Sequence, residues 1–120
     1  LDSISNLVGK HQELPRVAKN EGRLIKTHEP FHAKYRRAVL LVRDGRDVAV
    51  SEYHYQRVYS ANFARYDNSF AKFLDHFLAG KSNGYRSWQS HVASWLDAAS
   101  TPGYDIMVLP FERMKHNTFE

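Results

Sequence analysis

The stretch that decides the fold is residues 23–51, RLIKTHEPFHAKYRRAVLLVRDGRDVAVS. It contains two short apolar runs, at residues 24–25 and 38–42, and each run ends in a cluster of polar and charged side chains. A continuous apolar run is typical of a strand in a parallel sheet, because helices cover both faces of such a sheet. Ligands of open α/β sheets bind just beyond the carboxyl ends of the strands. The sequences KTH and RDGRD, which follow the two runs, therefore define a candidate site.

A helix is expected directly after the second apolar run. Asp44 can cap its N-terminus, and Asp47 stands three residues later, in a position that resembles a capping box. We expect this helix to run from Gly45 to about Val58. Its first turn would present free N–H groups and the positive end of the helix dipole, which together form a ready anion site.

The second half of the chain predicts two more helices and one more strand. Apolar residues at positions 70, 73, 74, 77 and 78 form an amphipathic helical pattern that ends at Gly80. Residues 85–99 show a second helical pattern, and residues 106–109 form a short buried strand. Residues 60–68 are expected to be a polar loop. With a first strand at residues 24–26, this order predicts an α/β fold with a mostly parallel sheet.

The composition indicates a soluble globular protein of one domain at most. The chain has 120 residues, of which 42% are hydrophobic and 25% charged. It has no cysteine, which fits a reducing compartment and leads us to expect a cytoplasmic location. No apolar run reaches membrane-spanning length and no signal peptide is visible. Because the chain does not begin with Met, we expect it to be a fragment.

A net charge of +4 and a pI near 9.4 favour an anionic ligand. A positive field concentrates phosphate or sulfate groups near the protein surface. Nucleic acid is a weaker alternative, because the basic residues are scattered and carry no helix-turn-helix, zinc-finger or RRM signature. We therefore expect a small anionic ligand and no nucleic acid.

Residues 28–32, HEPFH, match the H-E-x-x-H pattern of zinc proteases. That pattern binds zinc only on a helix, where positions i and i+4 share a face. Pro30 would lie inside the helical turn, at a cost of about 3 kcal/mol, and it disfavours helical geometry at Glu29. We therefore reject the zinc interpretation and expect no metal site.

Four segments in the same order resemble the sulfotransferases that use 3′-phosphoadenosine 5′-phosphosulfate (PAPS). They are KTHEP, LLVRDGRDVAVS, GYRSWQSHVASWL and VLPFERMKHN, and they run from about residue 23 to the C-terminus, whereas residues 1–22 add little. The resemblance implies a P-loop-kinase-like sheet flanked by helices. It also implies sulfuryl transfer to a hydroxyl or amine group of a small-molecule acceptor.

The first cluster supplies the candidate catalytic residues. Sulfuryl transfer requires that the acceptor oxygen lose a proton and that charge on the leaving phosphate be stabilised. His28 is the candidate general base, because the pKa of an imidazole lies near working pH. Lys26 is the candidate cation near the sulfate, and Thr27 can assist through its hydroxyl or backbone amide. Their alternatives are a capping imidazole and a solvated lysine.

The second cluster supplies the candidate donor-binding residues. The family pattern pairs an Arg at this strand end with a Ser eight residues later, which Arg43 and Ser51 match. The guanidinium and the hydroxyl would hold the 3′-phosphate of PAPS. Their alternatives are a surface salt bridge of Arg43 with Asp44 or Asp47 and a Ser without a role on the helix. Phe111 lies where many family members have a Tyr near the adenine, so it would keep the stacking contact without the hydroxyl, and core packing is its alternative. His91 is expected to be structural.

Two family segments are not visible in the sequence. The phosphosulfate-binding loop would precede the KTH strand, but no G-x-x-x-x-G-K-[ST] motif is present, and a late Gly-rich basic segment would lie beyond residue 120. We therefore expect residues 1–120 to be one incomplete sulfotransferase domain that alone binds PAPS weakly and does not turn over. A missing strand would leave an unpaired sheet edge that favours self-association.

Two other functions remain open from the sequence. A different P-loop transferase, such as a small-molecule kinase, would need a Walker lysine and a magnesium ligand, and neither is recognisable. A non-catalytic module that binds anions or nucleic acid would show a steep salt dependence and no preference for PAPS.

Overall fold

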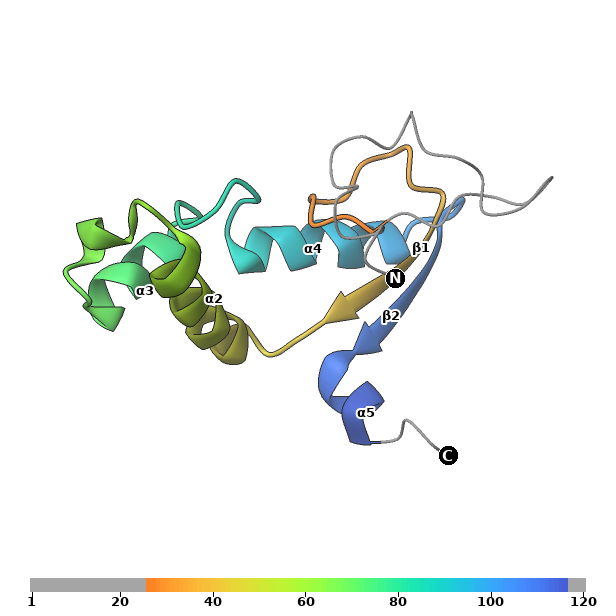
Figure 1. The fold of residues 1–120 in the computed structure, drawn as a ribbon. Coiled ribbons are helices and arrows are strands. Elements are labelled where there is room, and N and C mark those ends of the chain that lie inside the picture. Colours follow the sequence, from red (N-terminus) through yellow and green to blue (C-terminus); the bar gives the residue numbers. More distant parts are fainter. Residues whose placement is uncertain (1–25, 117–120) are drawn as a thin grey trace, which may run out of the picture.

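The computed structural model of the protein describes residues 26–116, which form a small parallel sheet toward one end and a group of helices toward the other (Figure 1). In chain order the elements are β1 (Arg37–Val42), α2 (Gly45–Tyr59), a 3₁₀ helix η1 (Phe63–Tyr66), α3 (Phe70–Leu78), α4 (Trp88–Ala99), β2 (Asp105–Pro110) and α5 (Phe111–His116). The strands predicted at residues 38–42 and 106–109 and the helix predicted from Gly45 are present. The expected α/β fold is confirmed.

The two strands are direct neighbours and run parallel. Their register pairs Arg37 with Asp105 at one end and Val42 with Pro110 at the other. The segments that follow the two strands therefore leave the sheet side by side, at the edge where the sequence predicts a ligand. The first strand expected from the sequence, at residues 24–26, lies outside the described residues except for Lys26, which is not in a strand.

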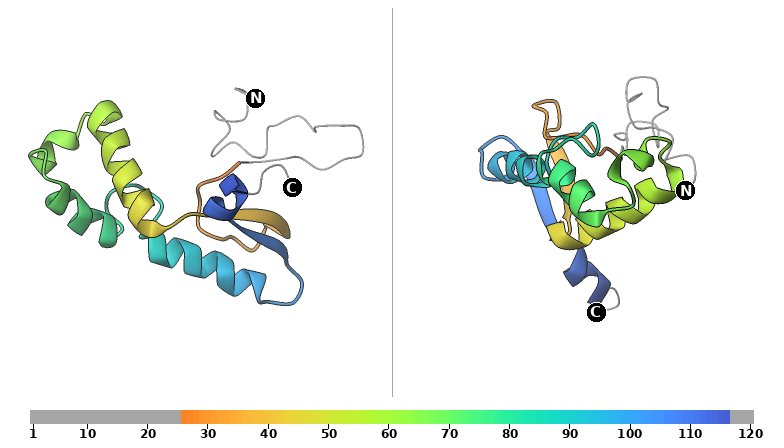
Figure 2. Two further views of the ribbon diagram at one scale, coloured as in Figure 1. Left: turned by 90° about the horizontal axis from the view of Figure 1, so that it is seen from below. Right: turned by 90° about the vertical axis from the view of Figure 1, so that its left-hand side faces the viewer.

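The two faces of the sheet differ in exposure. Val39 and its partner Met107 share one face and are 64% and 62% exposed, whereas Leu40, on the opposite face, is only 7% exposed. Helix α4 packs against β2 and runs alongside the strands in Figure 2. Within residues 26–116 one face of the sheet thus keeps its apolar side chains exposed.

The predicted N-cap of α2 is present, but the capping box is not. The Asp44 carboxylate accepts the Arg46 backbone N–H at 2.8 Å and also bonds the Arg46 guanidinium. The side-chain hydrogen bond from Arg46, followed by the backbone bond, lowers the pKa of Asp44 to about 2. In a capping box, Asp47 would accept the Asp44 N–H. That N–H instead donates to Glu112, at 2.9 Å.

The main core lies between α2, η1 and α3, and it corrects one expectation. Residues 60–68 were expected to be a polar loop, but they contain η1, whose Phe63 and Tyr66 are 7% and 1% exposed. The Tyr53 hydroxyl donates to the Asn68 carbonyl at 2.7 Å and ties this segment to α2. The buried core residues are Ala49, Tyr53, Phe63, Tyr66, Phe73 and Phe77.

No helix between residues 26 and 116 is long and apolar enough to cross a membrane.

Helix α4 begins later than the apolar spacing predicted. Ser87 is its N-cap, and its hydroxyl accepts the Ser90 N–H at 3.2 Å, so Tyr85 precedes the helix. The connection from α3 is tight, because a Cβ on Gly80 (φ +71°) would lie 2.5 Å from the Ser87 nitrogen. Arg86 has a φ of +71°, in the left-handed region that favours glycine.

Candidate functional site

A cleft of about 770 Å³ lies at the carboxyl end of β1. Its walls come from the segment after residue 25, the end of β1, one side of α2 and the region from Asn83 to Val92. Four of the six predicted site residues line it: Lys26, His28, Arg43 and Ser51. The structure therefore brings the two clusters of the sequence to one cavity.

A second, smaller hollow of about 390 Å³ lies between the start of α2, α3 and the start of α4. Trp88 and Phe77 separate it from the larger cleft, since both line the two cavities. Its lining is more apolar and includes none of the six predicted site residues. We therefore consider the larger cleft as the candidate site.

His28 is an exposed imidazole on a segment without regular structure. Its ring lies 5.9 Å from the ring of Tyr85, centroid to centroid. Partial desolvation of the ring, and then the charges of Lys26 and His91, lower the pKa of His28 below its ordinary value of 6.5, while Glu52 acts in the opposite direction. At neutral pH the imidazole is thus predominantly neutral and can accept a proton.

The two residues before His28 have different surroundings. Lys26 is exposed and lines the cleft beside His28. The Thr27 hydroxyl oxygen accepts the Glu29 backbone N–H at 3.0 Å, which closes a local turn. Thr27 is half-buried and does not belong to the cleft lining formed by the described residues. The geometry thus favours Lys26 over Thr27 as a ligand-facing group.

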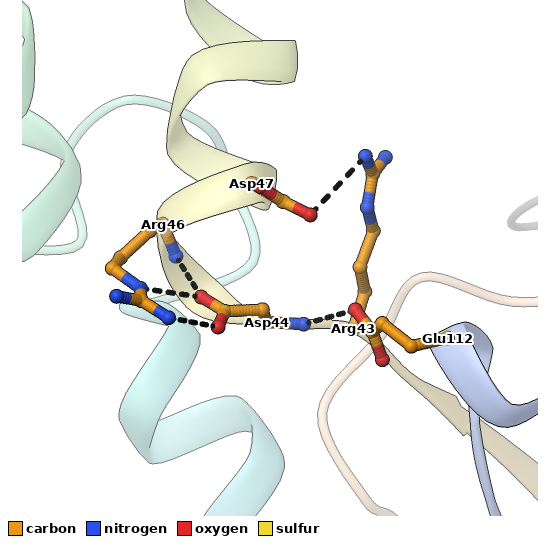
Figure 3. Close-up of polar contacts among 5 residues, drawn as sticks. All are labelled: Arg43, Asp44, Arg46, Asp47 and Glu112. Atoms are coloured by element: carbon orange, nitrogen blue, oxygen red, sulfur yellow. Dashed lines mark hydrogen bonds and ion pairs between the residues drawn. The ribbon is translucent and has the colours of Figure 1, made fainter.

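Arg43 keeps one buried donor without a partner. Its guanidinium carbon lies 5.1 Å from the centroid of the Phe111 ring. One terminal nitrogen is 3.7 Å from the Asp47 carboxylate (Figure 3). Within the described part of the chain, the Arg43 Nε is buried and has no hydrogen-bond partner. A buried N–H without a partner is costly.

The strand register explains the surroundings of Arg43. Asp44 and Glu112 are separated by 68 residues, the same offset as the β1–β2 pairs, so α5 begins beside the end of β1. The Glu112 carboxylate accepts the Asp44 N–H, and this bond is the main reason why the pKa of Glu112 is lowered (Figure 3). Phe111 packs against Arg43 and is not among the residues that line the described cleft. Its contact with adenine stays a prediction.

Several lining residues were missed by the sequence analysis. Tyr55 lines the cleft from α2, four residues after the predicted Ser51, and this spacing could have indicated a shared helix face. Tyr85 and Arg86 line it from the turn before α4, which the sequence assigned in part to the helix. His91 lines it from the first turns of α4.

The segment 28–32 is not helical. The His32 Nδ1 accepts the Lys34 backbone N–H at 3.2 Å, within a local turn. The shared helix face that the zinc-protease pattern needs is therefore missing. Across residues 26–116 no group of three or more His, Cys, Asp or Glu side chains is arranged to hold a metal ion.

A protein-family model described as a sulfotransferase domain matches residues 8–120. The match begins upstream of residue 23, so residues 8–22 also resemble the family. The sequence analysis placed the resemblance only from about residue 23 onward. Sulfotransferase 1B1 of Mus musculus is 34% identical over 102 residues, which cover 79% of this chain and 32% of that protein. Sulfotransferase 1E1 of Cavia porcellus is 32% identical over 123 residues, which cover 97% of this chain and 38% of that protein.

The structure also resembles a solved sulfotransferase. The crystal structure of mouse sulfotransferase SULT7A1 complexed with PAP matches with a TM-score of 0.64 and 28% sequence identity, over 81% of this chain and 35% of that one. The chain spans about a third of the length of the curated relatives it matches. The sequence and the fold agree, and the chain belongs to the sulfotransferase domain family.

Proposed function

We propose that the protein takes part in PAPS-dependent sulfuryl transfer to a hydroxyl or amine group of a small-molecule acceptor. The observation that carries this proposal is the single cleft lined by Lys26, His28, Arg43 and Ser51, in a chain of the sulfotransferase family. The PAP bound in the SULT7A1 structure supports an adenine nucleotide as the donor product. Residues 1–120 would then form one part of the catalytic domain.

The base in this mechanism is His28. Its lowered pKa leaves a ring nitrogen free to take the proton of the acceptor hydroxyl as the oxygen bonds to sulfur. PAPS supplies the sulfuryl group, and the bond between sulfur and the bridging phosphate oxygen breaks. Lys26, a compact cation beside His28, stabilises the negative charge that appears on that oxygen. This chemistry requires no metal.

Arg43 and Ser51 hold the 3′-phosphate of the donor in this proposal. The unpaired Nε of Arg43 fits that role, because a guanidinium offers several N–H donors to phosphate oxygens. Phosphate would compete with the long contact to Asp47, which is partly exposed and therefore weak. Thr27 would contribute through the backbone, and Phe111 would contact adenine while supporting the Arg43 guanidinium.

The acceptor would lie near His28, between Tyr55 and Tyr85, whose rings can contact an apolar or aromatic molecule.

A P-loop-type sheet and a cytoplasmic location belong to the same proposal. The family membership supports the P-loop-type sheet, and the absence of cysteine supports the cytoplasmic location. Self-association through an exposed sheet edge is a further part of this proposal, which the two-stranded sheet of residues 26–116 supports.

The test is sulfuryl transfer from labelled PAPS to a panel of phenols, alcohols and amines by the intact protein. We expect His28→Ala to lower turnover at least 100-fold, as expected for a lost general base, while PAPS still binds. His54→Ala, which changes an exposed histidine on α2, is the control and should keep normal turnover. Near-normal turnover by His28→Ala would refute the base role.

A further inference from the structure

Helix α4 holds the backbone of the segment that carries His28. The His91 Nε2 lies 3.1 Å from the carbonyl oxygen of His28 and 2.9 Å from that of Glu29. Carbonyl oxygens only accept hydrogen bonds, so the His91 Nε2 must carry the proton and donate to both. This arrangement fixes a proton on the Nε2 of His91.

Two further side chains of α4 hold the same segment. The Trp95 indole N–H donates to the Glu29 carbonyl at 3.2 Å, and the Ser94 hydroxyl accepts the Phe31 N–H at 3.1 Å. Positions 91, 94 and 95 fall at i, i+3 and i+4, so they lie on one face of the helix. The rings of Phe31 and Trp95 add an edge-to-face contact at 5.4 Å.

The segment needs such support because it has no regular structure. Residues 26–32 form neither helix nor strand, and Pro30 has no N–H to donate. Half-buried carbonyl groups without partners would be costly. His91 and Trp95 donate to these carbonyl groups, Ser94 accepts the Phe31 N–H, and the three contacts together fix where the Cα of His28 lies. The contact between the rings of His28 and Tyr85 then constrains the side chain of His28.

We infer that His91 is a positioning residue for sulfuryl transfer: it clamps the His28 backbone to α4 and so holds the His28 imidazole beside Tyr85 in the cleft. His91 does not exchange a proton with the substrate in this scheme. The catalytic part of the inference rests on the proposed function, but the clamp itself does not. The two parts can therefore be tested separately.

The groups that face the His28 ring set the expected pH response. They are Lys26 on its own segment, Glu52 on α2, Tyr85 before α4 and His91 on α4. Lys26 and His91 disfavour the charged imidazole, and Glu52 favours it. Removal of His91 takes away one of the repulsive groups and also releases the segment toward solvent. Both changes raise the pKa of His28 toward its ordinary value.

The clamp is tested by NMR on the full chain with labelled histidine, without any turnover. In the unmodified protein we expect His91 to be the Nε2–H tautomer and an NOE to connect the His28 and Tyr85 rings. His91→Phe keeps an aromatic ring but loses the donor, so it should abolish that NOE and raise the pKa of His28. His91→Gln keeps an N–H donor and should preserve the NOE. His54→Phe is the matched control and should change neither.

The clamp is wrong if His91→Phe leaves both the NOE and the His28 pKa unchanged while the spectrum shows a folded protein. If His91→Phe fails to fold, Ser94→Ala provides the same test, because it removes one contact to the segment and should weaken the NOE. An unchanged NOE in that variant would also count against the clamp.

The catalytic part is tested by steady-state kinetics of the intact protein. A displaced base lowers kcat without weakening donor binding, so His91→Phe should lower kcat about 100-fold with the Kd for PAPS within about twofold. His91→Gln should recover most of that loss. If the NMR result holds but kcat stays normal, the clamp exists and the base role of His28 fails, which separates the two claims.

Discussion

At the scale of single residues, side chains from separate segments of the chain meet in the cleft. The strand-end rule predicted that Lys26, His28 and Arg43 share a site, and the family resemblance added Ser51. All four line one cleft. The contact between Glu112 and the Asp44 N–H could not be predicted in the same way. It joins residues 68 positions apart and depends on the register of two strands.

The first residue-scale prediction concerns Glu112. Glu112→Ala frees the Asp44 N–H and loosens the support of Arg43, so we expect it to weaken 3′-phosphate binding a few-fold. We expect the preference for PAP over adenosine 5′-phosphate to fall by that factor in calorimetric titrations. Glu112→Gln keeps an oxygen acceptor and should retain the preference, as should Lys115→Ala on the same helix. Equal weakening of both nucleotides would show that Glu112 does not act through Arg43.

The second residue-scale prediction is a pH dependence. Because folding disfavours the charged form of His28, the unfolded chain binds more protons below the ordinary pKa of 6.5. His28 therefore lowers stability as the pH falls through 6.5 toward its depressed folded value, and it has no such effect well above 6.5. In urea unfolding we expect His28→Gln to gain stability relative to the unmodified protein below pH 6.5 only. A constant difference from pH 5 to pH 8 would disagree with the lowered pKa.

At the scale of elements, the N-cap signal at Asp44 located α2 and apolar spacing located α3. Phe73 and Phe77 belong to the predicted apolar face of α3, and they are 0% and 6% exposed. The spacing failed where aromatic residues pack without helical periodicity. Phe63 and Tyr66 join the core from a single 3₁₀ turn, and such a turn is too short to show a repeat.

The start of α4 was misplaced for a different reason. Tyr85 fits the apolar spacing of the helix, but the N-cap is Ser87 and Arg86 adopts a positive φ. The left-handed conformation separates Tyr85 from the helix and allows it to line the cleft. Sequence periodicity cannot reveal such a backbone conformation when the residue is not glycine.

The element-scale prediction follows from Arg86. A non-glycine residue at a φ of +71° is strained, so Arg86→Gly should stabilise the protein by about 1 kcal/mol and raise its Tm by a few degrees. Lys81→Gly, in the same connection but without a positive φ, is the control and should not stabilise. Calorimetric melting of the two variants tests this prediction. A lower Tm for Arg86→Gly would contradict it, because it would mean that the Arg86 side chain stabilises the protein by more than the strained backbone destabilises it.

At the scale of the whole molecule, the parallel pairing of β1 and β2 brings the site together. Their common direction places Arg43 beside Phe111, and the cleft opens at that edge of the sheet. The sequence predicted this edge from the rule that ligands bind beyond the carboxyl ends of strands. It did not predict how α4 supports the His28 segment, because that support depends on tertiary contacts about 63 residues apart.

The central claim is that one cleft binds the 3′-phosphate at Arg43 and Ser51 while His28 faces the acceptor. Its most direct measurement is an NMR titration of the chain with PAP and, separately, with adenosine 5′-phosphate, which detects even weak binding. We predict that PAP shifts the Arg43 Nε–H and the Ser51 amide strongly, and that adenosine 5′-phosphate, which lacks the 3′-phosphate, shifts them little. If both nucleotides shift these groups equally, or if PAP instead perturbs the hollow lined by Leu74 and Leu78, the claim is contradicted.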